Sequence, residues 1–160
     1  MKAWTDQFTW RDWLMLAGSV IGINLFGALP ALFVGADTDW FEQPVFYPPE
    51  ILFPIVWTIL FTLMGLALFL VVRSGTAGRQ QAVALALFGL QLLLNISWTP
   101  VFFGLQQPGW SLLILVALWG AIVATIIAFE RIDRLAAALL VPYLLWVSFA
   151  FVLTVGIIRA

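Results

Sequence analysis

The sequence contains neither cysteine nor histidine. Without these residues the chain can form no disulfide, no zinc site of thiolate or imidazole ligands, and no Ser-His catalytic triad. Haem ligation is restricted to methionine or tyrosine, which are weak candidates. We therefore expect no metal site and no cofactor.

Charged residues are also scarce. They make up 9% of the chain, against 64% hydrophobic residues, and the net charge is −1. An ordinary soluble domain is about 25% charged and about 45–50% apolar. A soluble fold of this size cannot bury so much apolar surface, which indicates that lipid is the solvent. The lack of a basic field excludes nucleic acid as a partner.

Five long apolar runs follow one another along the chain. A helix needs about 20 mostly apolar residues to cross the hydrocarbon core of a bilayer. The segments that meet this requirement are residues 13–34, 51–72, 82–103, 110–129 and 135–158, and no charged residue falls within them. We predict an all-α integral membrane protein in which residues 1–160 form a single bundle of five transmembrane helices.

The basic residues are divided unevenly between the two ends of such a bundle. Arg159 is alone at one end, and the other end has Lys2, Arg11, Arg73, Arg79, Arg131 and Arg134. By the positive-inside rule, the N-terminus is cytoplasmic and the loop after the first span is external. We expect the lipid bilayer to be a prokaryotic cell membrane.

Small residues recur at helical spacing in the first span, where Gly18 and Gly22 form a G-x-x-x-G pattern. Such residues let two helix backbones approach closely in a membrane. We expect them to pack inside the bundle, with dimerisation as the less favoured alternative.

Polar residues deep in a membrane need partners, so their positions are informative. Gln91, Asn95 and Trp98 share one face of the third span at positions i, i+4 and i+7. Pro100 follows, and it removes a helical hydrogen bond and bends the end of that span. Asn95 has two open interpretations: a hydrogen bond to a neighbouring helix, or a contact with a ligand.

The spans lack the groups that catalysis needs. They contain no paired carboxylates and no base beside a nucleophile, and no glycine-rich phosphate loop is present. Ion-coupled transport is unsupported too, because it usually requires an acid or base inside the membrane. The remaining interpretation is a pocket with aromatic walls and a few polar groups, a design suited to an apolar small molecule.

Three stretches resemble the TspO/MBR family of translocator proteins and tryptophan-rich sensory proteins. The first includes Pro48-Pro49, Phe53-Pro54 and Trp57-Thr58. The second and most specific is Gln91-Leu92-x-Leu94-Asn95-x-x-Trp98-Thr99-Pro100-x-Phe102-Phe103-Gly104. The third is Pro142-Tyr143-Leu144-x-Trp146-Val147-x-Phe149-Ala150. The resemblance covers most of the chain, from about Trp40 to Leu153.

This resemblance implies a five-helix bundle, often a homodimer, that binds porphyrins, sterols and synthetic benzodiazepine-site ligands. A tetrapyrrole here would be held by shape and stacking. The implied ligand-binding residues are Trp57, Asn95, Trp98, Trp110, Trp146 and Ala150. Three functions remain open: a receptor or carrier for tetrapyrrole-like ligands, a light-dependent porphyrin-degrading enzyme, and a stress-response or assembly scaffold without turnover.

The chain also departs from the family pattern. The first loop has Gln43-Pro44 where the family has Lys-Pro, and the second span has Leu60-Phe61 where the family has Leu-Tyr. The family's sterol motif needs a tyrosine before a basic residue, but only Arg159 is present. Sterol recognition through that motif is therefore not expected.

Overall fold

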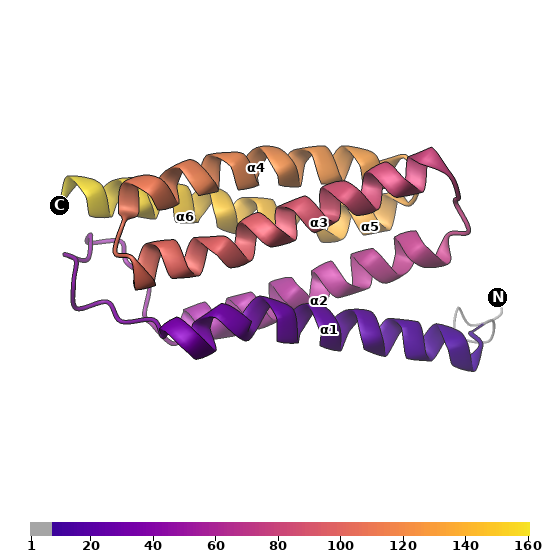
Figure 1. The fold of residues 1–160 in the computed structure, drawn as a ribbon, viewed down its shortest axis with the longest axis horizontal. Helices are drawn as coiled ribbons and strands as arrows, with labels where there is room; N and C mark the ends of the chain where they lie inside the picture. Colours follow the sequence, from indigo (N-terminus) through magenta and orange to yellow (C-terminus); the bar gives the residue numbers. More distant parts are fainter. Residues whose placement is uncertain (1–7) are drawn as a thin grey trace.

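The computed structural model describes residues 8–160, and this part of the chain is helical with no strand. The elements are α1 (Trp10–Val34), α2 (Leu52–Arg73), α3 (Arg79–Thr99), the π-helical turn η2 (Pro100–Gly104), α4 (Pro108–Glu130), α5 (Arg134–Leu139) and α6 (Val141–Arg159). Five helical stretches, the last formed by α5 and α6 together, are long and apolar enough to cross a membrane. They run side by side and alternate in direction (Figure 1). The predicted five-span bundle is confirmed.

The bundle has two ends. The 35–51 loop, the turn between η2 and α4, and the C-terminus lie at one end, while the start of α1 and the α2–α3 and α4–α5 turns lie at the other (Figure 1). Every basic side chain that the structure describes, apart from Arg159, belongs to the second end. Lys2, which was counted with them, lies outside the described residues.

Helix ends are set by local sequence. Thr9 caps α1 by accepting a hydrogen bond from the Asp12 backbone N–H, and the Asp12 carboxylate accepts one from the Thr9 N–H. This capping box starts the helix three residues before the predicted span. Asp12 also pairs with Arg73 at 3.2 Å, which ties the start of α1 to the end of α2.

Two prolines interrupt the spans. α3 ends at Thr99, and Pro100 begins the π-helical turn η2. Pro142 lies in the first turn of α6, directly after the break at Leu140 that separates α5 from α6. Proline lacks the N–H that would continue each helix, so α3 changes to a π-helical turn at Pro100 and the fifth span is made of two helices.

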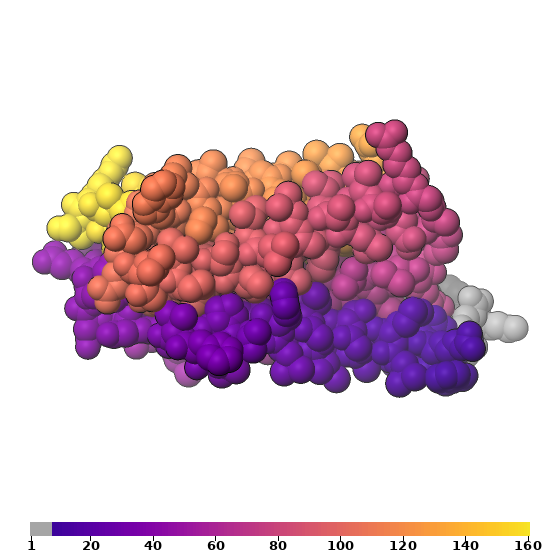
Figure 2. All heavy atoms as spheres, in the orientation of Figure 1, coloured from indigo at the N-terminus to yellow at the C-terminus, as the bar shows by residue number. Residues whose placement is uncertain are grey.

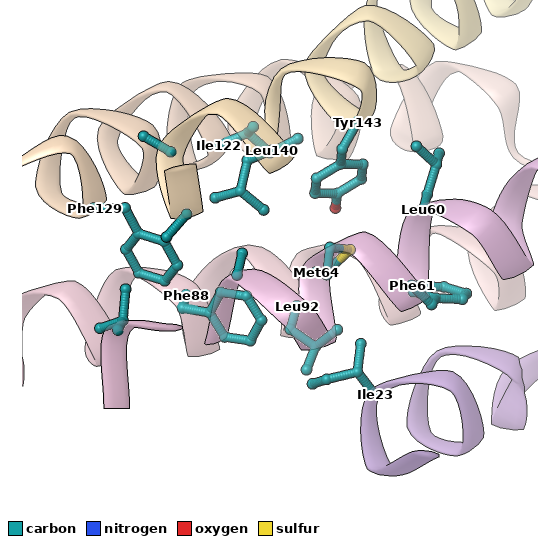
Figure 3. Packing of buried hydrophobic residues seen from close by; sticks show 14 of the residues in the cluster. Ile23, Leu60, Phe61, Met64, Phe88, Leu92, Ile122, Phe129, Leu140 and Tyr143 are labelled. Atoms are coloured by element: carbon teal, nitrogen blue, oxygen red, sulfur yellow. The ribbon is translucent and has the colours of Figure 1, made fainter. Parts of the chain in front are cut away.

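The half of the bundle away from the 35–51 loop, called here the closed half, is solidly packed. Met64, Phe88, Phe129 and Tyr143 come from four different helices and are almost completely buried. The Phe88 and Phe129 rings stack with centroids 5.7 Å apart and planes 9° from parallel. Figure 3 shows Tyr143 of α6 directed into the interior that it shares with Met64 and Phe88.

α1 packs against α2 through glycines, but not through the predicted ones. A Cβ at Gly65 would lie 2.6 Å from the Val20 Cα, so only glycine allows this approach. Within the described residues, a Cβ at Gly18 or Gly22 would meet nothing within 4 Å. The expectation that this pair packs inside the bundle is wrong, because the pair lies on the outward side of α1.

α1 is the most peripheral helix. Ile23 is its one buried side chain, and large apolar side chains such as Leu25, Leu32 and Phe33 are exposed. Its side chains meet those of α3 and η2 along the face shown in Figure 2.

Candidate ligand-binding site

A cavity of about 440 Å³ lies between the helices next to the 35–51 loop, in what we call the open half of the bundle. Its volume falls within the range of about 300–1,000 Å³ typical of small-molecule sites. Its walls come from all five spans and from the loop, and most of the lining is apolar. The lining residues are Asn24, Gly27, Ala28, Ala31, Ala36, Thr38, Tyr47, Glu50, Phe53, Pro54, Trp57, Thr58, Phe61, Asn95, Trp98, Thr99, Phe102, Phe103, Leu115, Leu118, Trp146, Val147, Ala150, Leu153, Thr154 and Ile157.

Aromatic rings from α2 and α6 form two of the walls. Trp57 stacks on Phe61, with centroids 5.3 Å apart and planes at 26°. Phe53 meets the Trp146 ring edge-on at 5.9 Å. Ala150 lies one turn after Trp146 and is small enough to leave space between these rings. Such flat surfaces favour a flat, apolar ligand.

Trp98 on α3 supplies a wall and a free hydrogen-bond donor. Its ring stacks on Phe102 at 4.8 Å and 12°. Its indole Nε1 is buried and has no hydrogen-bond partner. A buried N–H without a partner costs about 1–3 kcal/mol. The indole N–H is therefore an unsatisfied polar group beside the cavity that Trp98 lines.

Asn95 has a structural partner. Its Nδ2 donates to the Tyr143 hydroxyl at 2.9 Å, which joins α3 to α6. The interpretation of Asn95 as an interhelical hydrogen bond is therefore confirmed. Asn95 also lines the cavity. A contact between Asn95 and a ligand, the second interpretation, stays a prediction.

The polar face predicted on the third span divides between two environments. Asn95 and Trp98 reach the cavity, whereas Gln91 lies in the closed half and is 1% exposed. Neither side-chain amide atom of Gln91 has a hydrogen-bond partner. The i, i+4 spacing predicted the shared face correctly, but it does not show where along the face a cavity ends.

Trp110 lies apart from the other predicted site residues. It is 65% exposed on the outer surface of α4 and borders a shallow groove with Leu94, Val101 and Leu113. α4 begins at Pro108, and the next residue after the tryptophan, Ser111, is the one that turns inward and is buried. Trp110 therefore has the position of a residue in the interfacial aromatic belt.

The 35–51 loop supplies cavity residues that sequence reasoning missed. The Thr38 hydroxyl donates to Glu50 Oε1 at 2.7 Å, and both residues line the cavity. Tyr47 packs on Phe53 at 5.6 Å. Burial raises the pKa of the Tyr47 hydroxyl, and the nearby Glu50 carboxylate adds to the rise. In the sequence, the aromatic pair Phe46-Tyr47 directly before Pro48-Pro49 is the feature that could have indicated an ordered loop packed on the bundle.

An aromatic cluster holds this loop on the bundle. The Trp40 ring lies 5.2 Å from Phe102 and 4.8 Å from Phe41. Like Trp98, Trp40 has a buried Nε1 without a partner, although Trp40 does not line the cavity.

The family model that matches this sequence is that of the TspO/MBR family, over residues 19–159. The chain belongs to the TspO/MBR family. It is 47% identical over 144 residues to the tryptophan-rich protein TspO of Chlorobaculum tepidum, covering 87% of this chain and 91% of that one.

More distant TspO/MBR relatives match over a similar length. Protein CrtK of Rhodobacter capsulatus is 35% identical over 134 residues, covering 83% of this chain and 84% of CrtK. The human translocator protein is 35% identical over 142 residues, covering 86% and 84% respectively. Family membership and the five spans together make this chain an integral membrane protein.

The polar groups of the cavity are few and mostly neutral. Among residues 8–160, no group of three or more acidic residues could hold a metal ion. The geometry offers a ligand aromatic surface and a few neutral polar side chains, among them Trp57, Asn95 and Trp146.

Proposed function

We propose that this protein is a membrane receptor or carrier that binds a flat, largely apolar ligand of the tetrapyrrole class in the cavity of its open half. Trp57, Trp98 and Trp146 would contact the faces and edge of the ring, and Asn95 and Ala150 would complete the walls. The observation that carries the proposal is a mostly apolar cavity with aromatic walls, beside which the buried Trp98 indole N–H has no partner. Trp110 is left out of this site because it lies on the outer surface.

The relatives' names support a role in the membrane. They describe translocator and tryptophan-rich sensory proteins, which fits binding without turnover. The only ionisable groups among the described cavity residues are Glu50 and Tyr47, both at the loop. A general acid and base pair deep in the cavity is therefore lacking in the described lining.

Light-dependent porphyrin breakdown is the second candidate, because Trp57 and Trp146 face the cavity together. Illuminating the purified complex with protoporphyrin IX separates the two functions. A spectrum that stays unchanged in light and darkness supports binding alone, whereas a new product in light supports the enzyme.

The binding test is a titration in darkness, followed by quenching of tryptophan fluorescence. Protoporphyrin IX and its dimethyl ester should both give saturable quenching. Ala150→Leu should fill the cavity and abolish or strongly weaken it. Ala117→Leu is the matched control, because Ala117 is exposed on the outer face of α4. Equal affinity in both variants would place the ligand elsewhere.

The cytoplasmic N-terminus, the prokaryotic cell membrane and the homodimer belong to the same proposal. The uneven distribution of basic residues supports the orientation, and the bacterial TspO and CrtK relatives support the membrane. The exposed glycine pair Gly18 and Gly22 offers one face on which a second copy could pack.

A further inference from the structure

The end of the cavity next to the 35–51 loop has one sign of charge. Among the described residues that line the cavity, Glu50 is the only one with a charged side chain, and no lysine or arginine belongs to the lining. The 35–51 loop carries three more carboxylates, Asp37, Asp39 and Glu42, and no basic residue. Arg159 lies at this end of the bundle, but it is exposed and does not line the cavity.

Glu50 is held in place at this end of the cavity. The hydrogen bond from Thr38 fixes its carboxylate between the two ends of the loop. The pKa of the neighbouring Tyr47 hydroxyl is raised by burial and, to a smaller extent, by the negative charge of Glu50. A ligand that enters or protrudes at the loop therefore meets a positioned negative charge.

The interior offers no compensation to a buried anion. A carboxylate that leaves water needs a charged partner or several hydrogen bonds. Apart from Glu50, the described lining holds only neutral polar side chains, among them Trp57, Trp98, Trp146 and Asn95, and one amide hydrogen of Asn95 is already used by Tyr143. Neutral donors without a cationic partner suit a neutral acceptor, such as the carbonyl oxygen of an ester, amide or ketone, better than a carboxylate.

We propose that this cavity selects ligands that present a neutral hydrogen-bond acceptor, and that Glu50 is the residue that disfavours anionic ligands. This inference rests on the proposed function, since it concerns the same cavity. For tetrapyrroles, it means that esterified or amidated side chains are preferred to free carboxylates.

The test measures how one substitution changes the affinity of two related ligands. Protoporphyrin IX has two carboxylates, and its dimethyl ester has none. Glu50→Gln removes the charge but keeps an oxygen that accepts the Thr38 hydrogen bond. It should tighten binding of the free acid about threefold to tenfold, because an exposed carboxylate is partly screened, and should change binding of the ester less than about twofold. Comparing variants within each ligand cancels the ester's greater partitioning into detergent.

Glu42→Gln is the matched control. It removes the same charge from the same loop, but Glu42 is exposed and does not line the cavity. It should change the affinity for either porphyrin less than about twofold. Raising the salt from about 20 mM to about 500 mM should tighten free-acid binding to the wild type, and should do so much less in Glu50→Gln.

The outcomes separate the two proposals. If both porphyrins bind the wild type and Glu50→Gln affects both equally or neither, the selectivity inference is overturned and the proposed function survives. If Glu42→Gln matches Glu50→Gln, the selectivity belongs to the general field of the loop and the role of Glu50 is overturned. If neither porphyrin binds the wild type, the proposed function fails, and the inference fails with it.

Discussion

The closed and open halves of the bundle use the same five spans in opposite ways. In the closed half, Met64, Phe88 and Phe129 meet at the centre and fill it. In the open half, small residues such as Ala31 and Ala150 face the centre, and rings stand around a cavity. Protein interiors are normally packed as densely as organic crystals. A cavity therefore needs a rigid frame, and the closed half together with the aromatic cluster under the loop provides it.

The largest expected loss of stability comes from removing a buried side chain in the closed half. Phe129→Ala removes a fully buried ring that stacks on Phe88. We expect a loss of roughly 3 kcal/mol in the free energy of unfolding, at the low end for such truncations because lipid is itself apolar. Thermal unfolding in detergent measures this loss. Phe33→Ala is the control, since Phe33 is 82% exposed; an equal loss there would mean that packing does not distinguish the two halves.

The Asn95–Tyr143 hydrogen bond lies at the border between the halves. Two variants break it, one by removing the donor and the other by removing the acceptor. Asn95→Ala should lower stability by about 0.5–1.5 kcal/mol and weaken ligand binding by about twofold to 13-fold. Tyr143→Phe removes the same bond, but Tyr143 does not line the cavity. It should lower stability similarly and leave affinity within about twofold. Unchanged affinity in Asn95→Ala would make that residue purely structural.

The smallest effect on stability is expected in the open half. Trp98→Phe keeps the stacking on Phe102 but removes an indole N–H that has no partner. Stability should fall no more than in a tryptophan whose N–H is paired, because only ring volume is lost, while affinity should fall by about twofold to 13-fold if the N–H contacts the ligand. Trp119→Phe serves as the control, because the Trp119 N–H already donates to Ser148 at 3.0 Å. A melting temperature that falls more in Trp98→Phe than in Trp119→Phe would contradict an unpartnered donor.

The sequence predicted the spans well because hydrophobic length alone identifies a helix that crosses a membrane. It also identified five of the residues that meet at the cavity: Trp57, Asn95, Trp98, Trp146 and Ala150. Trp110 does not line the cavity. The start of α4 at Pro108 decides which residue of its first turn faces inward, and that residue is Ser111. Thr38 and Glu50 could not be predicted as neighbours, since a loop brings its two ends together only through tertiary packing.

The sparse burial of α1 has a consequence for the dynamics of the cavity. Acyl chains solvate apolar helix surface about as well as other helices do, so releasing a weakly packed helix into lipid costs little. Apart from close packing at Gly65 and at Gly27, which lies against the Phe61 ring, the described polar ties of α1 to α2 are the Asp12–Arg73 ion pair and the bond from Asn24 to Thr62 at 3.1 Å. Among the cavity walls, α1 is therefore the one with the lowest free energy of local opening, and its amides should exchange with deuterium before those of α4.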